Sequence, residues 1–159
     1  MNQKSLAIWM KVVLTAMGIF GLALFAVAVP MKANEFIRQY SGFEPYYLPW
    51  VCLVCATGIP CYGVIVLGWR IASNIGRDRS FCRENASCLK WVSFLSAGDS
   101  ALLFIGSAAL WLCGMDHLGI LFTSFLVVFI GIAISAAAAI LSHLVAKAAV
   151  LQEENDLTI

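Results

Sequence analysis

One acidic side chain lies deep inside an apolar stretch of the sequence. Asp99 follows Trp91 by eight residues, about 12 Å at the rise of an α-helix, and is the only charged residue between Trp91 and Gly114. Because an ionised carboxylate is costly in lipid, we expect Asp99 to face other helices and to be neutral or paired. Ser96 and Ser100 adjoin it at helical spacing and offer hydroxyls for bonds between helices. The pattern favours a structural, hydrogen-bonded aspartate, with a proton or cation site and a contact for a partner helix as alternatives.

Two cysteines in a Cys-x-x-Cys pattern raise the question of redox chemistry. Cys52 and Cys55 stand near the start of an apolar run, a placement that resembles the four-helix, quinone-linked thiol oxidases of the bacterial disulfide-forming system. Those enzymes need a second cysteine pair to relay electrons, whereas Cys113 stands alone. Cys52 and Cys113 could share a depth and form a bridge, but cysteine also packs well as a small apolar residue. We therefore predict no enzyme activity and no cofactor, and keep a thiol-redox role for Cys52 and Cys55 as an alternative.

The other residues that could bind a metal are scattered. Cys82 and Cys88 have no nearby Cys or His to complete a four-ligand zinc site, so no metal centre is predicted. His143 falls near the end of the last apolar run, at a different depth from Asp99. We interpret His143 as an interfacial residue, with pH sensing as the alternative because its unperturbed pKa is near neutrality.

Small residues recur every four positions before His143. Gly131, Ser135 and Ala139 form a ridge that would let another helix approach closely. This ridge permits a homo-oligomer, and it equally permits packing between two helices of one chain.

The elements that must position these groups are suited to a membrane. Of 159 residues, 62% are hydrophobic, where roughly half is usual in a soluble domain. Backbone groups in lipid must be paired within their own segment, so apolar runs of about twenty residues are expected to be α-helices. We predict an all-α, four-helix transmembrane bundle that forms a single domain, with spans at about 8–29, 48–69, 91–114 and 118–145.

The distribution of basic residues predicts the orientation in the bacterial cytoplasmic membrane, because short loops rich in Lys and Arg stay in the cytoplasm. One side would carry Lys4, Lys11, Arg70, Arg77, Arg79, Arg83, Lys90 and Lys147, and the other side only Lys32 and Arg38. Both termini, the loop 70–90 and the tail 146–159 are therefore expected in the cytoplasm. A cleaved signal peptide ending near Ala28 is the alternative for the first span. The net charge of +1 argues against direct binding of nucleic acid.

The cytoplasmic loop is predicted to end in a helical extension of the third span. Ser80 is a candidate N-cap for that helix. Phe81 would be available to pack, while Arg83, Glu84 and Asn85 would face water or a partner. The loop is expected either to rest on anionic lipid headgroups or to form a docking surface for a protein.

The acidic tail lies beyond the last apolar run. Glu153, Glu154 and Asp156 stand close together there and are expected either to be solvated or to pair with the arginines of the loop. The mixture of acidic residues with Leu157 also suits docking into a groove of another protein. Glu154, Asn155 and Leu157 are the candidate docking residues of the tail.

Two segments carry a resemblance to a known family. The stretch Phe81-x-x-Glu84-Asn85 and the ending Glu154-Asn155-x-Leu157-Thr158-Ile159, together with four spans in this order, resemble the small bacterial membrane proteins grouped as domain of unknown function 2975. The likeness covers essentially the whole chain. Members have no established biochemical activity and are often encoded beside a small helix-turn-helix regulator, so the resemblance implies a membrane partner for a cytoplasmic transcription regulator.

The hypothesis that combines these observations is a non-enzymatic sensor or regulatory partner of a cytoplasmic protein. It would act through the loop and the acidic tail, with the lipid bilayer as its surroundings. A small transporter coupled to protons or cations through Asp99 is the first alternative, and thiol redox chemistry is the second.

Overall fold

The chain forms four long helices and, within the residues that the structure describes, no strand. The computed structural model describes residues 3–31, 34–35, 47–114 and 118–156. Helix α1 spans Gln3–Ala23 and continues through a π-helical turn, η1, at Leu24–Ala28; α3 spans Tyr47–Ile75, α4 spans Arg83–Leu112 and α5 spans Leu118–Asp156. All four are long and apolar enough to cross a membrane, which confirms the predicted all-α transmembrane fold.

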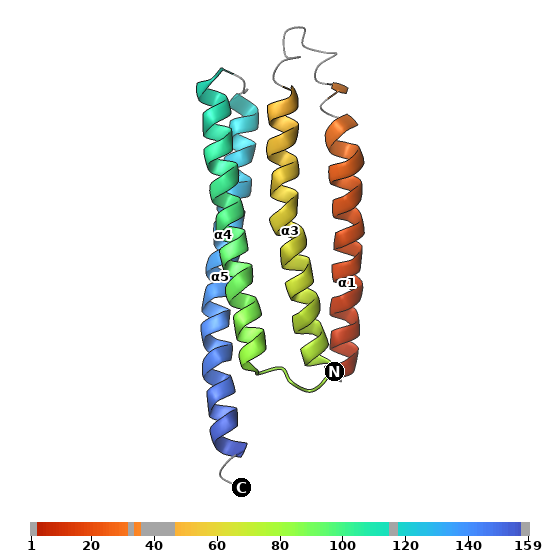
Figure 1. The fold of residues 1–159 in the computed structure, drawn as a ribbon, viewed down its shortest axis with the longest axis vertical. Helices are drawn as coiled ribbons and strands as arrows, with labels where there is room; N and C mark the ends of the chain where they lie inside the picture. Colours follow the sequence, from red (N-terminus) through yellow and green to blue (C-terminus); the bar gives the residue numbers. More distant parts are fainter. Residues whose placement is uncertain (1–2, 32–33, 36–46, 115–117, 157–159) are drawn as a thin grey trace.

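The helices stand side by side in chain order (Figure 1). Helix α1 packs on α3, α3 on α4 and α4 on α5, and successive helices run in opposite directions. The pair formed by α4 and α5 is the most extensive. The start of α1 and the end of α5 lie at the same end of the molecule, as an even number of crossings requires (Figure 1).

All four helices extend beyond the apolar runs that reveal them in the sequence, and α1 does so by beginning at Gln3. Helix α3 continues to Ile75 and α4 begins at Arg83, so the connection comprises only residues 76–82. Helix α5 continues to Asp156, so most of the expected tail is helical. Hydropathy marks where lipid ends, whereas a helix ends where Gly, Pro or a turn stops it. Residues 70–75, 83–90 and 146–156 contain neither Gly nor Pro.

Tryptophan side chains bracket the apolar part of two helices. Trp50 and Trp69 of α3 are nineteen residues apart, and Trp91 and Trp111 of α4 are twenty apart. At a rise of 1.5 Å per residue both separations are about 30 Å, the thickness of the hydrocarbon core, and tryptophan favours its boundary. The ammonium group of Lys11 lies 5.4 Å from the centre of the Trp69 ring. The level of Trp69 and Trp91 therefore marks one face of the hydrocarbon core.

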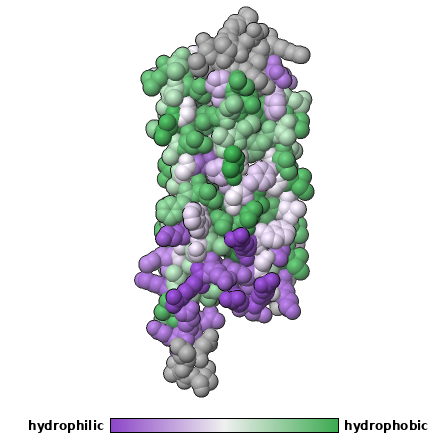
Figure 2. All heavy atoms as spheres, in the orientation of Figure 1, coloured by the Kyte–Doolittle hydropathy of each residue, from purple (hydrophilic) through white to green (hydrophobic). Residues whose placement is uncertain are grey.

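The distribution of polar side chains agrees with this boundary. Figure 2 shows hydrophobic side chains over the middle of the molecule and hydrophilic ones gathered at the end where α3 turns into α4. We call this end the basic end, defined by Arg77, Arg79 and Arg83, all of which are exposed.

Small side chains form most of the buried contacts between helices. Gly131 of α5 lies directly against Ser100 of α4, so that no Cβ would fit there without displacing the serine. Ser135 of α5 donates a hydrogen bond to the carbonyl of Ser93, at 2.9 Å. The predicted ridge is therefore occupied within the chain at Gly131 and Ser135. Ala139, the third residue of the predicted ridge, is exposed, whereas its neighbour Ala138 is buried at 8% exposure.

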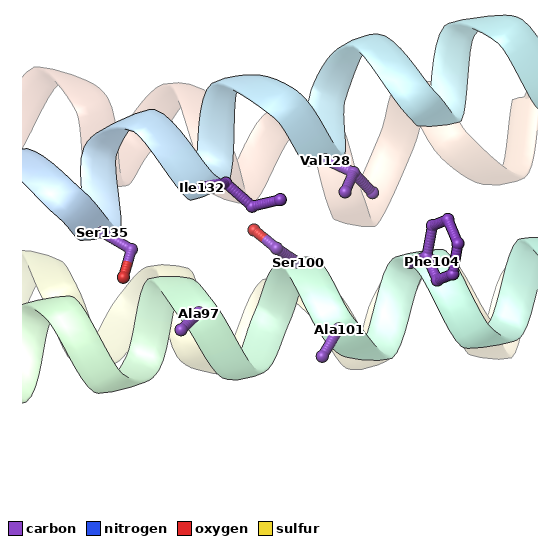
Figure 3. Close-up of a pocket in the computed structure, with 7 residues that line it drawn as sticks. All are labelled: Ala97, Ser100, Ala101, Phe104, Val128, Ile132 and Ser135. Atoms are coloured by element: carbon purple, nitrogen blue, oxygen red, sulfur yellow. The ribbon is translucent and has the colours of Figure 1, made fainter.

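A shallow groove of about 370 Å³ follows one side of the contact between α4 and α5 (Figure 3). Its lining residues are Ala97, Ser100, Ala101, Phe104, Val128, Ile132 and Ser135. The hydroxyls of Ser100 and Ser135 donate to backbone carbonyls of α4. The groove is therefore an apolar, lipid-level surface with little capacity for polar recognition.

Candidate functional site

The turn between α3 and α4, residues 76–82, has a well-defined backbone. The carbonyl of Asn74 accepts hydrogen bonds from the amides of Arg77 and Arg79, at 3.1 and 3.0 Å, and the amide of Asp78 donates to Ile75 at 3.1 Å. Asp78 has φ +60°, a left-handed conformation that Asp tolerates better than most residues. These bonds close α3 and reverse the chain toward α4. We call residues 76–82 the hairpin turn.

Asn85 locks the hairpin turn from the first part of α4. Its amide nitrogen donates to the carbonyls of Arg79 and Ser80, at 3.2 and 2.9 Å, and its amide oxygen accepts from Asn74 at 2.8 Å. The side chain is only 2% exposed. The prediction that Asn85 faces water or a partner protein is therefore wrong, because the side chain is buried and satisfies backbone carbonyls that the turn leaves without partners.

Asn74 also holds the hairpin turn, a contact that is not predicted from the sequence. Besides Asn85, its amide nitrogen lies 3.5 Å from a carboxylate oxygen of Glu84. Asn74 thus connects the last turn of α3 with the first turn of α4. A signal was available in the sequence, because Asn is unfavourable inside a helix and is favoured where a side chain can bond to a turn.

The start of α1 is attached to the same turn. The side-chain amide of Gln3 lies 3.1 Å from the hydroxyl of Ser80, and with its nitrogen turned inward it also donates to the Ile75 carbonyl and to Asp78, both at 3.2 Å. Ala7 packs beside Gly76. The prediction that Ser80 is the N-cap of α4 is wrong. Cys82 occupies that position, without a side-chain capping bond, because Asn85 and not a capping hydroxyl organises the turn.

Helix α5 is joined to the start of α4 by charge and by hydrogen bonding. The guanidinium of Arg83 donates to both carboxylate oxygens of Glu153, at 3.2 and 2.7 Å. The hydroxyl of Ser142 donates to the carbonyl of Ala86 at 2.7 Å. The side chains of Arg83 and Glu153 are 70% and 54% exposed, so screening limits the pair to between zero and about 1 kcal/mol. The bidentate geometry sets the position of α5 more than it stabilises the fold.

The hairpin turn presents an apolar ring to the surroundings. Phe81 lies in the hairpin turn, before α4 begins. Its side chain is 56% exposed and does not pack within the chain. Arg77, Arg79 and Glu84 are exposed around the same turn. Glu154 and Asn155 are exposed near the end of α5, and Leu157 lies outside the described residues. The predicted docking residues other than Asn85 and Leu157 therefore share one end of the molecule.

The hairpin turn lies well beyond the level of Trp69 and Trp91. Arg83 precedes Trp91 by eight residues, and Ile75 follows Trp69 by six. These intervals correspond to about 12 and 9 Å of helix. The headgroup layer adds only about 5–7 Å on each side of the hydrocarbon core. These lengths predict that the turn that carries Phe81 lies past the lipid headgroups.

Asp99 lies between α3 and α4 rather than among the predicted serines. The thiol of Cys61 on α3 lies 3.9 Å from one carboxylate oxygen of Asp99. The other oxygen is buried and has no hydrogen-bond partner among the described residues. Ser100 bonds to the backbone of Ser96 and faces α5. The structure therefore does not bring Ser96 and Ser100 together with the carboxylate.

The cysteines and His143 do not assemble into a reactive centre in the described parts of the chain. All six cysteines, Cys52 and Cys55 among them, are free thiols. No group of three or more His, Cys, Asp and Glu side chains gathers there in a way that could hold a metal ion. His143 is exposed on α5, one residue after the Ser142 that contacts α4 beyond Trp91. It is therefore far in depth from Asp99.

Comparisons with known proteins give a family and a relative. The family model described as "Protein of unknown function (DUF2975)" matches residues 31–159. The chain is 28% identical over 162 residues to "Uncharacterized membrane protein YoaS" of Bacillus subtilis (strain 168), with all of both chains covered. No solved structure matches the chain.

The family match confirms the resemblance carried by Phe81, Glu84, Asn85 and the C-terminal residues, and the relative is likewise a membrane protein. The four apolar helices identify this chain as a multi-pass membrane protein. The chain therefore belongs to the DUF2975 family.

Proposed function

We propose that this protein is a non-enzymatic regulatory membrane protein that presents the hairpin turn and the end of α5 to a cytoplasmic protein such as a helix-turn-helix transcription regulator. The proposal places the basic end in the cytoplasm. Arg70, Arg77, Arg79, Arg83 and Lys90 all lie at or near that end, and basic residues in short connections are retained there.

The observation that carries the proposal is the construction of the hairpin turn. Asn85, buried at 2% exposure, uses all of its amide groups to hold a turn whose outermost ring, Phe81, is 56% exposed. A fixed loop costs little further entropy when a partner binds. Side chains from α1, α3 and α4, those of Gln3, Asn74 and Asn85, converge on this short segment. A short segment held from several sides is the arrangement expected of a recognition surface.

The distance from the membrane favours a protein over lipid headgroups as the ligand of this surface. With Arg83 about 12 Å beyond Trp91 and a headgroup layer of about 5–7 Å, Phe81 stands in water rather than in the interface. An exposed aromatic ring in water gains most by entering an apolar pocket. The flanking Arg77 and Arg79 favour a pocket with an acidic rim.

The test places a photoreactive amino acid at position 81 in the full-length protein in living cells. The proposal predicts a specific adduct with one cytoplasmic protein, and loss of that adduct when Arg79→Ala is added. Phe129, which is 72% exposed at the level of the hydrocarbon core, provides the matched control and should give no protein adduct with a cytoplasmic partner. Adducts with lipid alone at position 81 would refute the proposal.

A second candidate function is supported by one observation at Asp99. Its buried carboxylate oxygen without a partner among the described residues is the arrangement expected where a proton or cation binds inside a membrane. If the protein couples flux to Asp99, proton uptake into vesicles should be lost in Asp99→Asn and retained in Cys61→Ala. Equal flux in the native protein, in Asp99→Asn and in empty vesicles would exclude this function.

A further inference from the structure

Three basic residues stand close to the membrane boundary that Trp69 and Trp91 mark. The ammonium group of Lys11, on α1, lies 5.4 Å from the centre of the Trp69 ring. Arg70 directly follows Trp69 on α3, and Lys90 directly precedes Trp91 on α4. Because one residue advances a helix by only about 1.5 Å, the three side chains lie on neighbouring helices at nearly the same depth. We call these three residues the boundary cations.

Two of the boundary cations are presented to one side of the row of helices. Helix α3 stands between α1 and α4 (Figure 1). Trp69 turns toward α1, where its ring meets Lys11. Arg70 turns toward α4, because Asn74 lies one helical turn farther on the same face and bonds to Asn85 of α4. Since consecutive residues of a helix are about 100° apart, Trp69 and Arg70 lean toward the same side of α3, and both are exposed there.

Within the part of the chain that the structure describes, no carboxylate forms an ion pair with a boundary cation. Helices α1 and α3 contain no acidic residue between their described ends. On α4, the acidic residues nearest to Lys90 are Glu84 and Asp99, about 9 and 14 Å away along the helix. Glu153 of α5 pairs instead with Arg83. The counter-charge of the boundary cations therefore has to come from outside the described chain.

The anion available at this depth is the phosphate of a lipid headgroup. The headgroup layer begins where the hydrocarbon core ends, beside the two tryptophans. Basic residues gathered next to a membrane helix bind anionic headgroups. The rings of Trp69 and Trp91 are 44% and 60% exposed, and a lipid covers such rings with its glycerol and upper acyl carbons. A free phosphate ion would leave the rings uncovered, and an acidic protein would have to displace the headgroups.

We infer that an anionic phospholipid binds on this side of α3, with its phosphate held by Lys11 and Arg70 and its acyl chains beside Trp69. Lys90 adds attraction from α4 over a short, weakly screened distance. Because Lys11 belongs to α1 and Arg70 to α3, a phosphate bound by both stabilises the contact between these two helices. The site lies nearer to the membrane than the hairpin turn, and it does not depend on the proposed partner protein.

Thermal unfolding of the full chain in a neutral detergent tests this inference. Added phosphatidylglycerol should raise the midpoint by at least about 2 °C more than the same amount of phosphatidylcholine does. Inorganic phosphate should not raise it. The test variant, Lys11→Gln with Arg70→Gln, should lose the difference between the two lipids. Equal shifts with both lipids in the native chain, an equal shift with inorganic phosphate, or a difference that survives in the test variant would overturn the inference.

The matched control is Lys4→Gln with Lys147→Gln, which removes the same charge from two exposed lysines. Lys4 precedes Lys11 by seven residues, about 10 Å of helix. Lys147 follows Ser135 by twelve residues, about 18 Å, and the bond from Ser135 to Ser93 places Ser135 just inside the boundary. Both lysines therefore lie past a headgroup layer of about 5–7 Å, and the control should keep the difference between the lipids. A control that loses the difference as fully as the test variant would count against the site.

Native mass spectrometry gives a second measurement that needs no removal of charge. The full chain, incubated with equal amounts of phosphatidylglycerol and phosphatidylcholine, should retain more of the anionic lipid. Lys11→Arg keeps the positive charge and should show the same preference, so the inference stays testable if the test variant fails to fold. Equal retention of the two lipids by the native chain would also overturn the inference.

Discussion

The two outer pairs of helices are joined in different ways. Helices α4 and α5 meet through small side chains that bond to backbone, such as Ser135 to Ser93 and Ser142 to Ala86. Helix α1 and the adjoining η1 meet α3 through large side chains set against glycines, such as Leu14 of α1 beside Gly68 and Phe25 of η1 beside Gly58. Flexible side chains can adjust when their surroundings change, whereas backbone contacts cannot. The comparison indicates that α4 and α5 form a more rigid pair, whereas α1 and α3 form a more adaptable pair.

The largest loss of stability is expected when a larger side chain is introduced at the closest contact between α4 and α5, the rigid pair. Gly131→Leu would force α5 away from Ser100 of α4 and should lower the free energy of unfolding in mixed micelles by about 1–3 kcal/mol. In the adaptable pair, Gly68→Ala would meet only the side-chain end of Leu14, at 3.1 Å. Its cost should be smaller, because Leu14 can rotate. Equal losses in the two variants would remove the distinction between the pairs.

A similar or slightly smaller loss of stability is expected when the side chain that holds the hairpin turn is removed. Asn85→Ala leaves the carbonyls of Arg79 and Ser80 without the donor that satisfies them in the native turn. An unsatisfied buried group costs about 1–3 kcal/mol. Hydrogen exchange of residues 76–82 should accelerate strongly, while the exchange of the bilayer halves of α4 and α5 stays unchanged. Unchanged exchange in the turn would show that Asn85 does not hold it.

A smaller loss of stability is expected when a hydroxyl group that bonds two helices is removed. Ser135→Ala removes the bond to the Ser93 carbonyl from the rigid pair, and Tyr62→Phe removes a bond of 2.9 Å to the Gly18 carbonyl from the adaptable pair. Each bond is worth about 0.6 kcal/mol inside a membrane. Thermal unfolding should detect both losses, and a double variant should lose their sum because the sites are independent. A strongly non-additive double variant would mean that the two pairs are coupled.

The smallest effect on stability is expected at the ion pair between α4 and α5. Arg83→Gln breaks the contact with Glu153, but at 70% and 54% exposure the pair contributes at most about 1 kcal/mol, and less at high salt. The position of the end of α5 should change more than the stability does. One spin label is placed on α4 near Arg83 and another on α5 near Glu153. The distribution of distances between the two labels should broaden in Arg83→Gln and in the native protein at high salt. A distribution that stays narrow in both would show that Ser142 alone holds α5 in place.

The sequence predicts the membrane-level features well because they depend on hydropathy alone. Four spans follow from the apolar runs, and the family follows from Phe81, Glu84 and Asn85. The ends of the helices could not be predicted in the same way, because residues 70–75 and 146–156 lie beyond the apolar runs yet contain neither Gly nor Pro to stop a helix.

The side chains of the candidate site were predicted only in part. The pairing of an acidic residue on α5 with Arg83 was an open alternative, and the structure has it at Glu153. The burial of Asn85 depends on its meeting Asn74 across a turn, a contact that becomes evident only once α3 and α4 are side by side. Asp99 likewise faces Cys61 of α3 and not the serines of its own helix. Side-chain partners on other helices depend on helix rotation, which hydropathy does not define.

The central claim is that the hairpin turn holds Phe81 in water beyond the lipid headgroups. A spin label at position 81, in a full chain whose native cysteines are replaced by alanine and which is reconstituted in liposomes, tests it most directly. A label at Phe94, exposed at 61% on the membrane side of Trp91, serves as the reference. The account predicts that a water-soluble nickel complex relaxes the label at 81 and that dissolved oxygen relaxes the label at 94. Relaxation of the label at 81 by oxygen rather than by nickel would place Phe81 in lipid and contradict the account.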